Sequence, residues 1–182
     1  VPLPTIFNAK TIDPQKSDST PVIQLETAMG AAIECFAGAI AVCVPRSRFA
    51  PVKKCSDLLL LRSDAYVVNQ DSVLVLNPEC KGVAPIIDLD SKKYKLVQNL
   101  ESSAREGYPS LVKCKKLIVK GHVYFSSKQI FEGNVTIVNN SDEPKFLAPG
   151  IYRDQTIDLT SAIGLGSFKP SIIATTPYLD QK

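Results

Sequence analysis

Cationic side chains gather on a segment that two prolines bracket. Arg46 and Arg48 follow Pro45, and Lys53 follows Pro51. Each proline fixes its own φ and biases the residue before it away from helical geometry, which makes the segment a stiff loop. A stiff loop can hold cationic groups toward an anion with little conformational entropy left to lose. The pattern therefore predicts an anion-binding loop.

The residues on either side of this loop predict a strand, the loop and a helix in that order. Ala39–Val44 is an apolar run of strand length, and Pro45 ends it. After the loop, Ser56 or Asp57 can cap a helix through Leu58–Tyr66. Strand, loop and helix in succession are typical of part of an α/β layer.

Two further elements are predicted upstream of the loop. Leu3–Phe7 is a short strand that ends at Asn8, with Lys10 close behind. Because ligands of α/β proteins bind at the carboxyl ends of strands, Asn8 and Lys10 are candidate binding residues. Glu26 lies at the start of a predicted amphipathic helix, where a negative charge is favourable. The apolar face of that helix is formed by Leu25, Met29, Ile33 and Phe36.

The middle of the chain is predicted to be a connector. Val73–Leu76 has the composition of one strand. Asn77-Pro78 and Lys81-Gly82 are turn signals. Ser91–Ala104 has apolar residues at helical spacing, with charged residues at most other positions.

A six-residue period begins at Leu117. The first and third positions of successive blocks are apolar except at Gln129, and Gly121 and Gly133 occupy the same slot. This period is typical of a parallel β-helix, whose coils bury their inward side chains against one another. An antiparallel meander with alternating faces is the other arrangement the pattern allows. The residues at the first and third positions are Leu117, Val119, Val123, Phe125, Gln129, Phe131, Val135 and Ile137.

The composition limits the classes of function. The 182 residues are 45% hydrophobic, enough for one domain or two small ones. A net charge of +3, with no row of aromatic residues among the basic ones, argues against nucleic-acid binding. No apolar run approaches the ~20 residues that span a bilayer, so no membrane partner is expected. The N-terminus shows neither a secretory signal nor an initiator methionine, and we expect the chain to begin inside a larger protein.

The cysteines and the one histidine do not form a recognisable metal or disulfide pattern. Five cysteines, an odd number without CxxC spacing, favour reduced thiols in a cytoplasmic protein. His122 has no cysteine or carboxylate partner at catalytic or ligand spacing, and we expect it to be exposed on a turn.

Several segments of the chain stand in the order of one known family. Together they resemble eukaryotic UTP–glucose-1-phosphate uridylyltransferases, the UDP-glucose pyrophosphorylases, over the whole chain except its C-terminal tail. The loop and the segment around Gln24 are the most specific. The matching segments are Asn8-Ala9-Lys10-Thr11, Val22-Ile23-Gln24-Leu25-Glu26-Thr27-Ala28-Met29-Gly30-Ala31-Ala32-Ile33, the proline-bracketed loop with Ser56-Asp57-Leu58-Leu59, and Pro109-Ser110-Leu111-Val112 with Val119-Lys120-Gly121.

The resemblance implies an α/β fold that is divided into three parts. Residues 1–70 would be the C-terminal part of a Rossmann-like nucleotidyltransferase domain, 71–110 a connector with one helix, and 111–182 a left-handed parallel β-helix and tail. The glycine-rich nucleotide loop, the metal-binding aspartate and the glucose-contacting asparagines of the family would lie upstream of Val1. The chain is therefore expected to be the C-terminal portion of the enzyme and inactive without the upstream catalytic portion.

The resemblance also implies a reaction: UTP and glucose-1-phosphate give UDP-glucose and pyrophosphate, with Mg²⁺ whose ligands are upstream of this chain. By position in the motif, Lys53 matches the phosphate-contacting active-site lysine of the family. Arg46 and Arg48 either contact phosphate or hold the loop through a carboxylate such as Glu26. Phe49 is either a core residue or part of the wall of the ligand site. The alternative to a functional role for Lys53 is an ordinary solvated surface lysine.

Two other functions remain open at this stage. The chain can be a non-catalytic structural module whose β-helix braces the catalytic domain or forms a homo-oligomer. Alternatively, the whole protein can be a pyrophosphorylase of broader UDP-sugar specificity. Turnover by the chain with and without the upstream portion separates the first alternative from an enzyme part, and assays with galactose-1-phosphate test the second.

Overall fold

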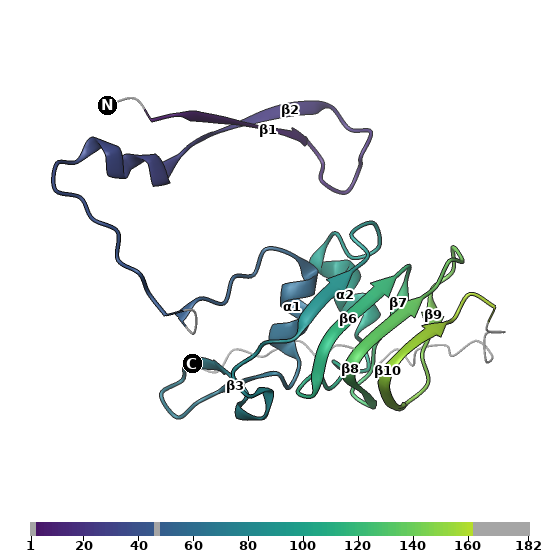
Figure 1. Cartoon of the computed structure of the whole chain (residues 1–182). Coiled ribbons are helices and arrows are strands. Elements are labelled where there is room, and N and C mark those ends of the chain that lie inside the picture. The colour runs from purple at the N-terminus through teal and green to yellow at the C-terminus, as the bar shows by residue number, and fades with distance from the viewer. Residues whose placement is uncertain (1–2, 46–47, 162–182) are drawn as a thin grey trace, which may run out of the picture. The chain divides into compact units, whose positions relative to one another are not determined.

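The computed structural model describes residues 3–45 and 48–161. Two compact units divide the chain, one ending at Pro51 and the other beginning at Val52. Figure 1 shows the elements of each unit.

The first unit contains a two-stranded antiparallel hairpin. Strand β1 (Thr5–Thr11) pairs with β2 (Pro21–Thr27) along its whole length. Local hydrogen bonds close the turn between them, and in one of them the Asp13 amide donates to the Ser19 hydroxyl at 3.0 Å. A 3₁₀ helix, η1 (Met29–Cys35), follows β2 directly.

Three expectations for this unit are wrong. The strand predicted at Leu3–Phe7 continues to Thr11, so Asn8 and Lys10 lie inside β1 and not beyond its end. Glu26 lies in β2, not on a helix, because the stretch before Thr27 pairs with β1 and leaves only a short 3₁₀ helix after it. The predicted strand over residues 39–44 has no ladder partner in the described part of the chain.

The described residues of the first unit form no core. None of them is buried, and large apolar side chains are open to solvent, with Phe7 69% and Met29 72% exposed. Backbone pairing and a few exposed or half-buried side-chain hydrogen bonds hold the hairpin together, and an isolated two-stranded hairpin is marginally stable in water. The unit thus presents an apolar surface that its own residues do not cover.

The second unit begins with α1 (Cys55–Arg62). An antiparallel hairpin of β3 (Tyr66–Val68) and β4 (Leu74–Leu76) follows, then η3 (Pro78–Cys80), β5 (Ile86–Leu89) and α2 (Val97–Ser103). The expected strand, the two turns and both helices are present. The helices are displaced or shortened: α1 starts earlier and ends at Arg62, because Tyr66 enters β3, and α2 covers only the second half of its predicted span.

A four-stranded parallel sheet dominates the second unit. Its order is β10 (Gly150–Asp158), β8 (Gln129–Val138), β6 (Cys114–Lys120) and β5, and Figure 1 shows β6, β8 and β10 side by side. A second parallel pair joins β7 (Val123–Tyr124) to β9 (Lys145–Phe146). All these pairs are parallel, so the antiparallel meander is excluded for this part of the chain.

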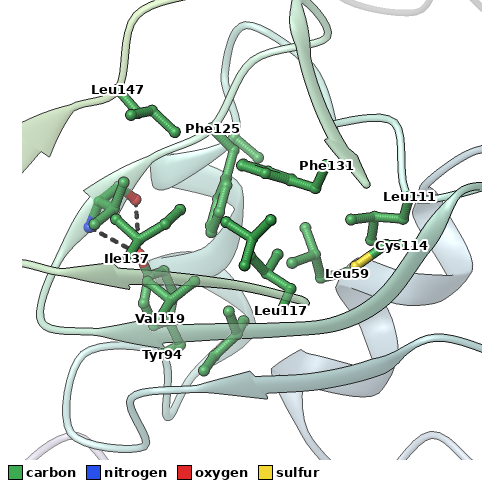
Figure 2. Close-up of a cluster of buried hydrophobic side chains, with 14 of the residues drawn as sticks. Leu59, Tyr94, Leu111, Cys114, Leu117, Val119, Phe125, Phe131, Ile137 and Leu147 are labelled. Atoms are coloured by element: carbon green, nitrogen blue, oxygen red, sulfur yellow. Dashed lines mark hydrogen bonds between the residues drawn. The ribbon is translucent and has the colours of Figure 1, made fainter. Parts of the chain in front are cut away.

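The six-residue period predicted the core correctly. Every first-position and third-position residue of the four blocks is buried, and Figure 2 shows several of them facing one another. Gln129, the one polar member, is also inside: its amide donates to the Leu147 carbonyl at 2.8 Å, and its oxygen accepts from the Ser126 amide at 3.1 Å. A buried amide is tolerated when its donors and acceptors are paired, as they are here.

The two glycines that share a slot are required by backbone geometry. Gly121 has a φ of +81°, and a Cβ there would overlap the Asn139 carbonyl oxygen. Gly133 has a φ of +65°, and a Cβ there would overlap the Asp154 carboxylate. The repeat therefore places glycine where the main chain passes close to the next segment along the chain, at Asn139 and at Asp154.

Replacement of Gly121 by alanine should destabilise the fold. Left-handed φ strain and overlap with main-chain atoms together should lower the free energy of unfolding by about 3 kcal/mol. Gly82→Ala is the matched control, since Gly82 has a φ of +79° with open space around it. Its cost should stay near 1 kcal/mol. Urea unfolding followed by circular dichroism measures both, and equal costs would show that the close approach to Asn139 does not matter.

Candidate functional site

Lys53 is exposed on the turn that leads into α1. The main chain around it is held by one carboxylate oxygen: Oδ2 of Asp57 accepts the Lys53 amide at 2.8 Å and the Lys54 amide at 2.9 Å. Asp57 was expected only as a helix cap. It is the third residue of α1 and reaches back to two successive residues, so the ammonium of Lys53 extends from a restrained backbone.

The start of α1 is in turn fixed to the parallel sheet. The Ser56 hydroxyl accepts the Leu89 amide of β5 at 3.1 Å. Cys55 and Leu59 are buried in the hydrophobic core. Burial raises the pKa of the Cys55 thiol, which disfavours the thiolate and leaves this cysteine a packing residue. The turn that carries Lys53 is thus attached to the core on its C-terminal side.

A second carboxylate secures the chain just after α1. Asp64 Oδ1 accepts the Leu111 amide at 2.6 Å and the Val112 amide at 3.1 Å, and the Ser110 hydroxyl donates to Oδ2. These contacts join residues that are far apart in sequence to the segment before β6. Both flanks of α1 are therefore fixed by side-chain to backbone bonds.

The electrostatics of this turn favour anion contact by side chains. The first free amides of a helix normally attract anions. Here the Asp57 carboxylate already occupies the amides of Lys53 and Lys54. These two amides are therefore not free to bind an anionic ligand, and such a ligand at this position would meet the ammonium group of Lys53. The arrangement suits a compact point charge directed at phosphate oxygens.

The arginines and Phe49 of the predicted loop lie in the first unit or outside the described residues. Arg46 falls outside the residues that the structure describes. Arg48 is exposed, and its amide donates to the Pro45 carbonyl at 3.0 Å. Phe49 is 54% exposed, so it is not a core residue of its unit.

The structure brings the other three candidates onto one face of the β1–β2 hairpin. Asn8 pairs with Gln24, Lys10 with Val22, and Ile6 with Glu26. Residues directly opposite each other share a face, as do alternate residues along a strand, so Asn8, Lys10 and Glu26 point to the same side. Glu26 also accepts a hydrogen bond from the Gln24 side chain at 2.9 Å.

Metal-ligand clusters and long apolar helices are absent from the described part of the chain. Residues 3–45 and 48–161 hold no group of three or more histidine, cysteine, aspartate or glutamate side chains placed to bind a metal ion. Within the same residues, no helix is long and apolar enough to cross a bilayer. Hollows in the second unit include one of about 190 Å³ beside Tyr124 and Phe146 and one of about 260 Å³ beside Asp64 and Tyr108.

Comparison with known proteins decides the family. The model of UTP–glucose-1-phosphate uridylyltransferase matches residues 1–131. The chain belongs to this family. The anchored Lys53 turn and the hairpin both lie within the matched residues.

Individual uridylyltransferases agree with this assignment. The enzyme of Astragalus penduliflorus is 43% identical over 129 residues, which are 71% of this chain and 27% of that protein. The enzyme of Hordeum vulgare is 44% identical over 126 residues, 69% of this chain and 26% of that protein. The chain spans about a quarter of the length of these curated relatives.

Solved structures of the family have the same fold. UDP-glucose phosphorylase of Trypanosoma brucei superposes with a TM-score of 0.81 at 48% identity, over 87% of this chain and 35% of that one. A variant of Leishmania major UDP-glucose pyrophosphorylase in complex with UDP-glucose superposes with a TM-score of 0.75 at 51% identity, over 87% of this chain and 33% of that one. The uridylyltransferase architecture therefore extends past the residues matched by the family model.

His122 differs from its expectation. It is half-buried, not exposed, and lies edge-on to Tyr94 with ring centroids 5.8 Å apart. Its Nε2 is 2.9 Å from the Ser103 hydroxyl, and this hydroxyl donates to the Asn99 carbonyl at 2.7 Å. The hydroxyl proton is thereby used, so Nε2–H is assigned as the donor to Ser103. Burial, together with the charge of Lys93, lowers the pKa of His122.

The lowered pKa makes His122 a source of acid sensitivity. A histidine whose pKa is lower in the folded state contributes stability that is complete above its unfolded pKa of ~6.5 and is lost as the pH falls through the folded value. Histidine changes its charge between about pH 8 and pH 5. Over this interval the urea midpoint of the wild type should therefore fall more than that of His122→Gln. Parallel pH profiles for the two proteins would contradict this assignment.

Proposed function

We propose that the chain supplies Lys53 to a uridylyltransferase that makes UDP-glucose and pyrophosphate from UTP and glucose-1-phosphate. One observation carries the proposal: an exposed lysine stands on a turn fixed by Asp57 and Ser56, within the residues that match the family model. A solved relative is a complex with UDP-glucose, whose diphosphate is an anion of the kind that this turn suits.

This reaction requires charge neutralisation at the phosphoryl oxygens more than it requires covalent catalysis by the protein. A phosphate oxygen of glucose-1-phosphate attacks the α-phosphorus of UTP, the new P–O bond forms, and the bond to the β-phosphate breaks to release pyrophosphate. Negative charge builds on the phosphoryl oxygens during this exchange. The Lys53 ammonium would bind these oxygens and strengthen its hold as their charge grows. When bound, Mg²⁺ supplies further charge neutralisation, and we assign its ligands to a part of the protein outside this chain.

The rest of the protein is required for this role. The first unit exposes Phe7, Leu25, Met29 and Phe36, which a folded domain would cover. We infer that residues 1–70 complete a nucleotidyltransferase domain whose other residues bury this surface. Asn8, Lys10 and Glu26 share one face of the hairpin, and we propose that this face lies toward the substrates, with Arg46, Arg48 and Phe49 on the adjoining loop.

We further propose that residues 111–182 belong to a left-handed β-helix. Supporting this are the parallel order of β6, β8 and β10, the second parallel pair, and the buried positions of the six-residue period. The free thiols of Cys55, Cys80 and Cys114 fit a reducing compartment, and we place the enzyme in the cytoplasm.

Replacement of Lys53 by alanine tests the catalytic role in the intact protein. Loss of one positioned charge donor to phosphoryl oxygens should lower kcat by about 10²–10³-fold while the melting temperature stays unchanged. Lys54→Ala is the matched control, because Lys54 is an exposed lysine next to Lys53 on the same turn. Its turnover should remain within about threefold of the wild type. Wild-type turnover by Lys53→Ala would refute the assignment.

A second function, assembly, is favoured by the edge of the sheet. Among the described residues, strand β10 stands at the end of the strand order, and Ile151 on it is 62% exposed, so this edge can receive a further strand or a second copy. The two functions make different predictions for separate pieces of the protein. The isolated chain should show no turnover, and mixing it with the upstream portion should restore activity. Full activity of the upstream portion alone, with loss of an oligomer in sedimentation, would support the assembly function instead.

A further inference from the structure

We propose that Asp57 is the residue that positions Lys53 for phosphate contact. The proposal rests on the function proposed above for Lys53 and concerns how that lysine is held. Asp57 does not contact the substrates in this proposal; it acts on the main chain of its neighbour. Its role is thus distinct from that of a catalytic residue.

The bonding pattern restrains both backbone torsions of Lys53. The Lys53 amide belongs to the peptide plane before its Cα, and the Lys54 amide belongs to the plane after it. One oxygen of Asp57 accepts both amides, at 2.8 and 2.9 Å. With both planes tied to one atom, φ and ψ of Lys53 are set, and the direction of its Cα–Cβ bond is set with them.

A charged acceptor is suited to this position. Hydrogen bonds from amides to a carboxylate are stronger than bonds to a neutral acceptor, and this turn is exposed, where water competes for each amide. Pro51 restricts the chain two residues before Lys53. The main chain of Lys53 is therefore restricted by Pro51 on its N-terminal side and by the hydrogen bonds of Asp57 at Lys53 and Lys54.

Helix capping alone does not account for all of this contact. A cap at the third helical residue needs to satisfy only the amide of Lys54, the residue that precedes α1. The additional bond to Lys53 reaches outside the helix. The start of α1 also keeps other supports, namely the Ser56–Leu89 hydrogen bond and the burial of Cys55 and Leu59. We therefore expect α1 to persist without the Asp57 carboxylate while Lys53 loses its orientation.

A double-mutant cycle in the intact protein tests the proposal. Asp57→Ala should lower kcat about tenfold with the KM for UTP within about twofold of the wild type, because a misplaced charge donor loses transition-state contact before it loses binding. In the Lys53→Ala background, the same substitution should change kcat by less than about twofold, since the group being positioned is gone. Asp57→Glu should recover most of the activity, because glutamate at this helical position also reaches back to the preceding amides.

The outcomes separate this proposal from the function on which it depends. Wild-type turnover by Lys53→Ala overturns the proposed function itself. If Lys53→Ala is impaired, an equal loss from Asp57→Ala with and without Lys53 shows a purely structural cap and overturns the positioning role. Unchanged kcat of Asp57→Ala overturns it as well.

Two further variants keep the test decisive. If Asp57→Ala does not fold, Asp57→Asn retains one neutral acceptor, and its kcat should lie between those of the wild type and Lys53→Ala; a wild-type value contradicts the proposal. Asp158→Ala is the matched control, because the Asp158 carboxylate also accepts a main-chain amide, from Thr160 at 2.8 Å, at a distant turn. Its kcat should equal that of the wild type.

Discussion

Parallel pairing around a layer of inward side chains is the constraint on which the second unit depends. Leu117 on β6 pairs with Val135 on β8, and Val119 pairs with Ile137, so side chains at equivalent positions stack directly inside the unit. All four are buried. Burial of each such side chain contributes about 1.5–3 kcal/mol, more than an exposed ion pair typically contributes. A shift of the strands by one residue would turn these side chains outward, so their burial also fixes the register.

The candidate site inherits its rigidity from this sheet. Strand β5 pairs with β6 at one edge, and the amide of Leu89 on β5 holds Ser56 at the start of α1. Asp57, one residue later, holds the main chain of Lys53. A short series of contacts therefore connects the buried core to an exposed ammonium group. These contacts fix the main-chain position from which the long and flexible side chain of Lys53 extends.

The first unit shows the opposite case. Its hairpin has regular pairing but no buried side chain among the described residues, and its large apolar groups face solvent. Hydrogen bonds between two strands do not provide the apolar burial that stabilises a domain. Such a segment is understandable as part of a larger sheet or core. The division at Pro51 thus places the candidate lysine in the unit that has a buried core, although it follows the proline-bracketed loop.

The sequence by itself determined the local features that depend on residue type and spacing. The six-residue period identified the apolar side chains that are buried, because apolar side chains at equivalent inward positions pack against one another. Gln129 was the exception to the apolar pattern, and only the structure shows that it is buried as well. The two glycines were identified as one slot, and the turns around Asn77 and Gly82 followed from their residue types. Lys53 was singled out from the proline-bracketed loop and its family resemblance.

Only the tertiary structure decided the features that depend on long-range partners. The apolar spacing from Leu25 predicted a helix, yet pairing with β1 draws Glu26 into a strand, since a cross-strand partner outweighs local periodicity. His122 is half-buried because the fold brings two side chains to it, Ser103 from α2 and Tyr94 from the segment that precedes α2. The bond between Ser56 and Leu89 joins residues more than thirty positions apart. No spacing rule encodes such contacts, because they arise only when the sheet has placed β5 beside the start of α1.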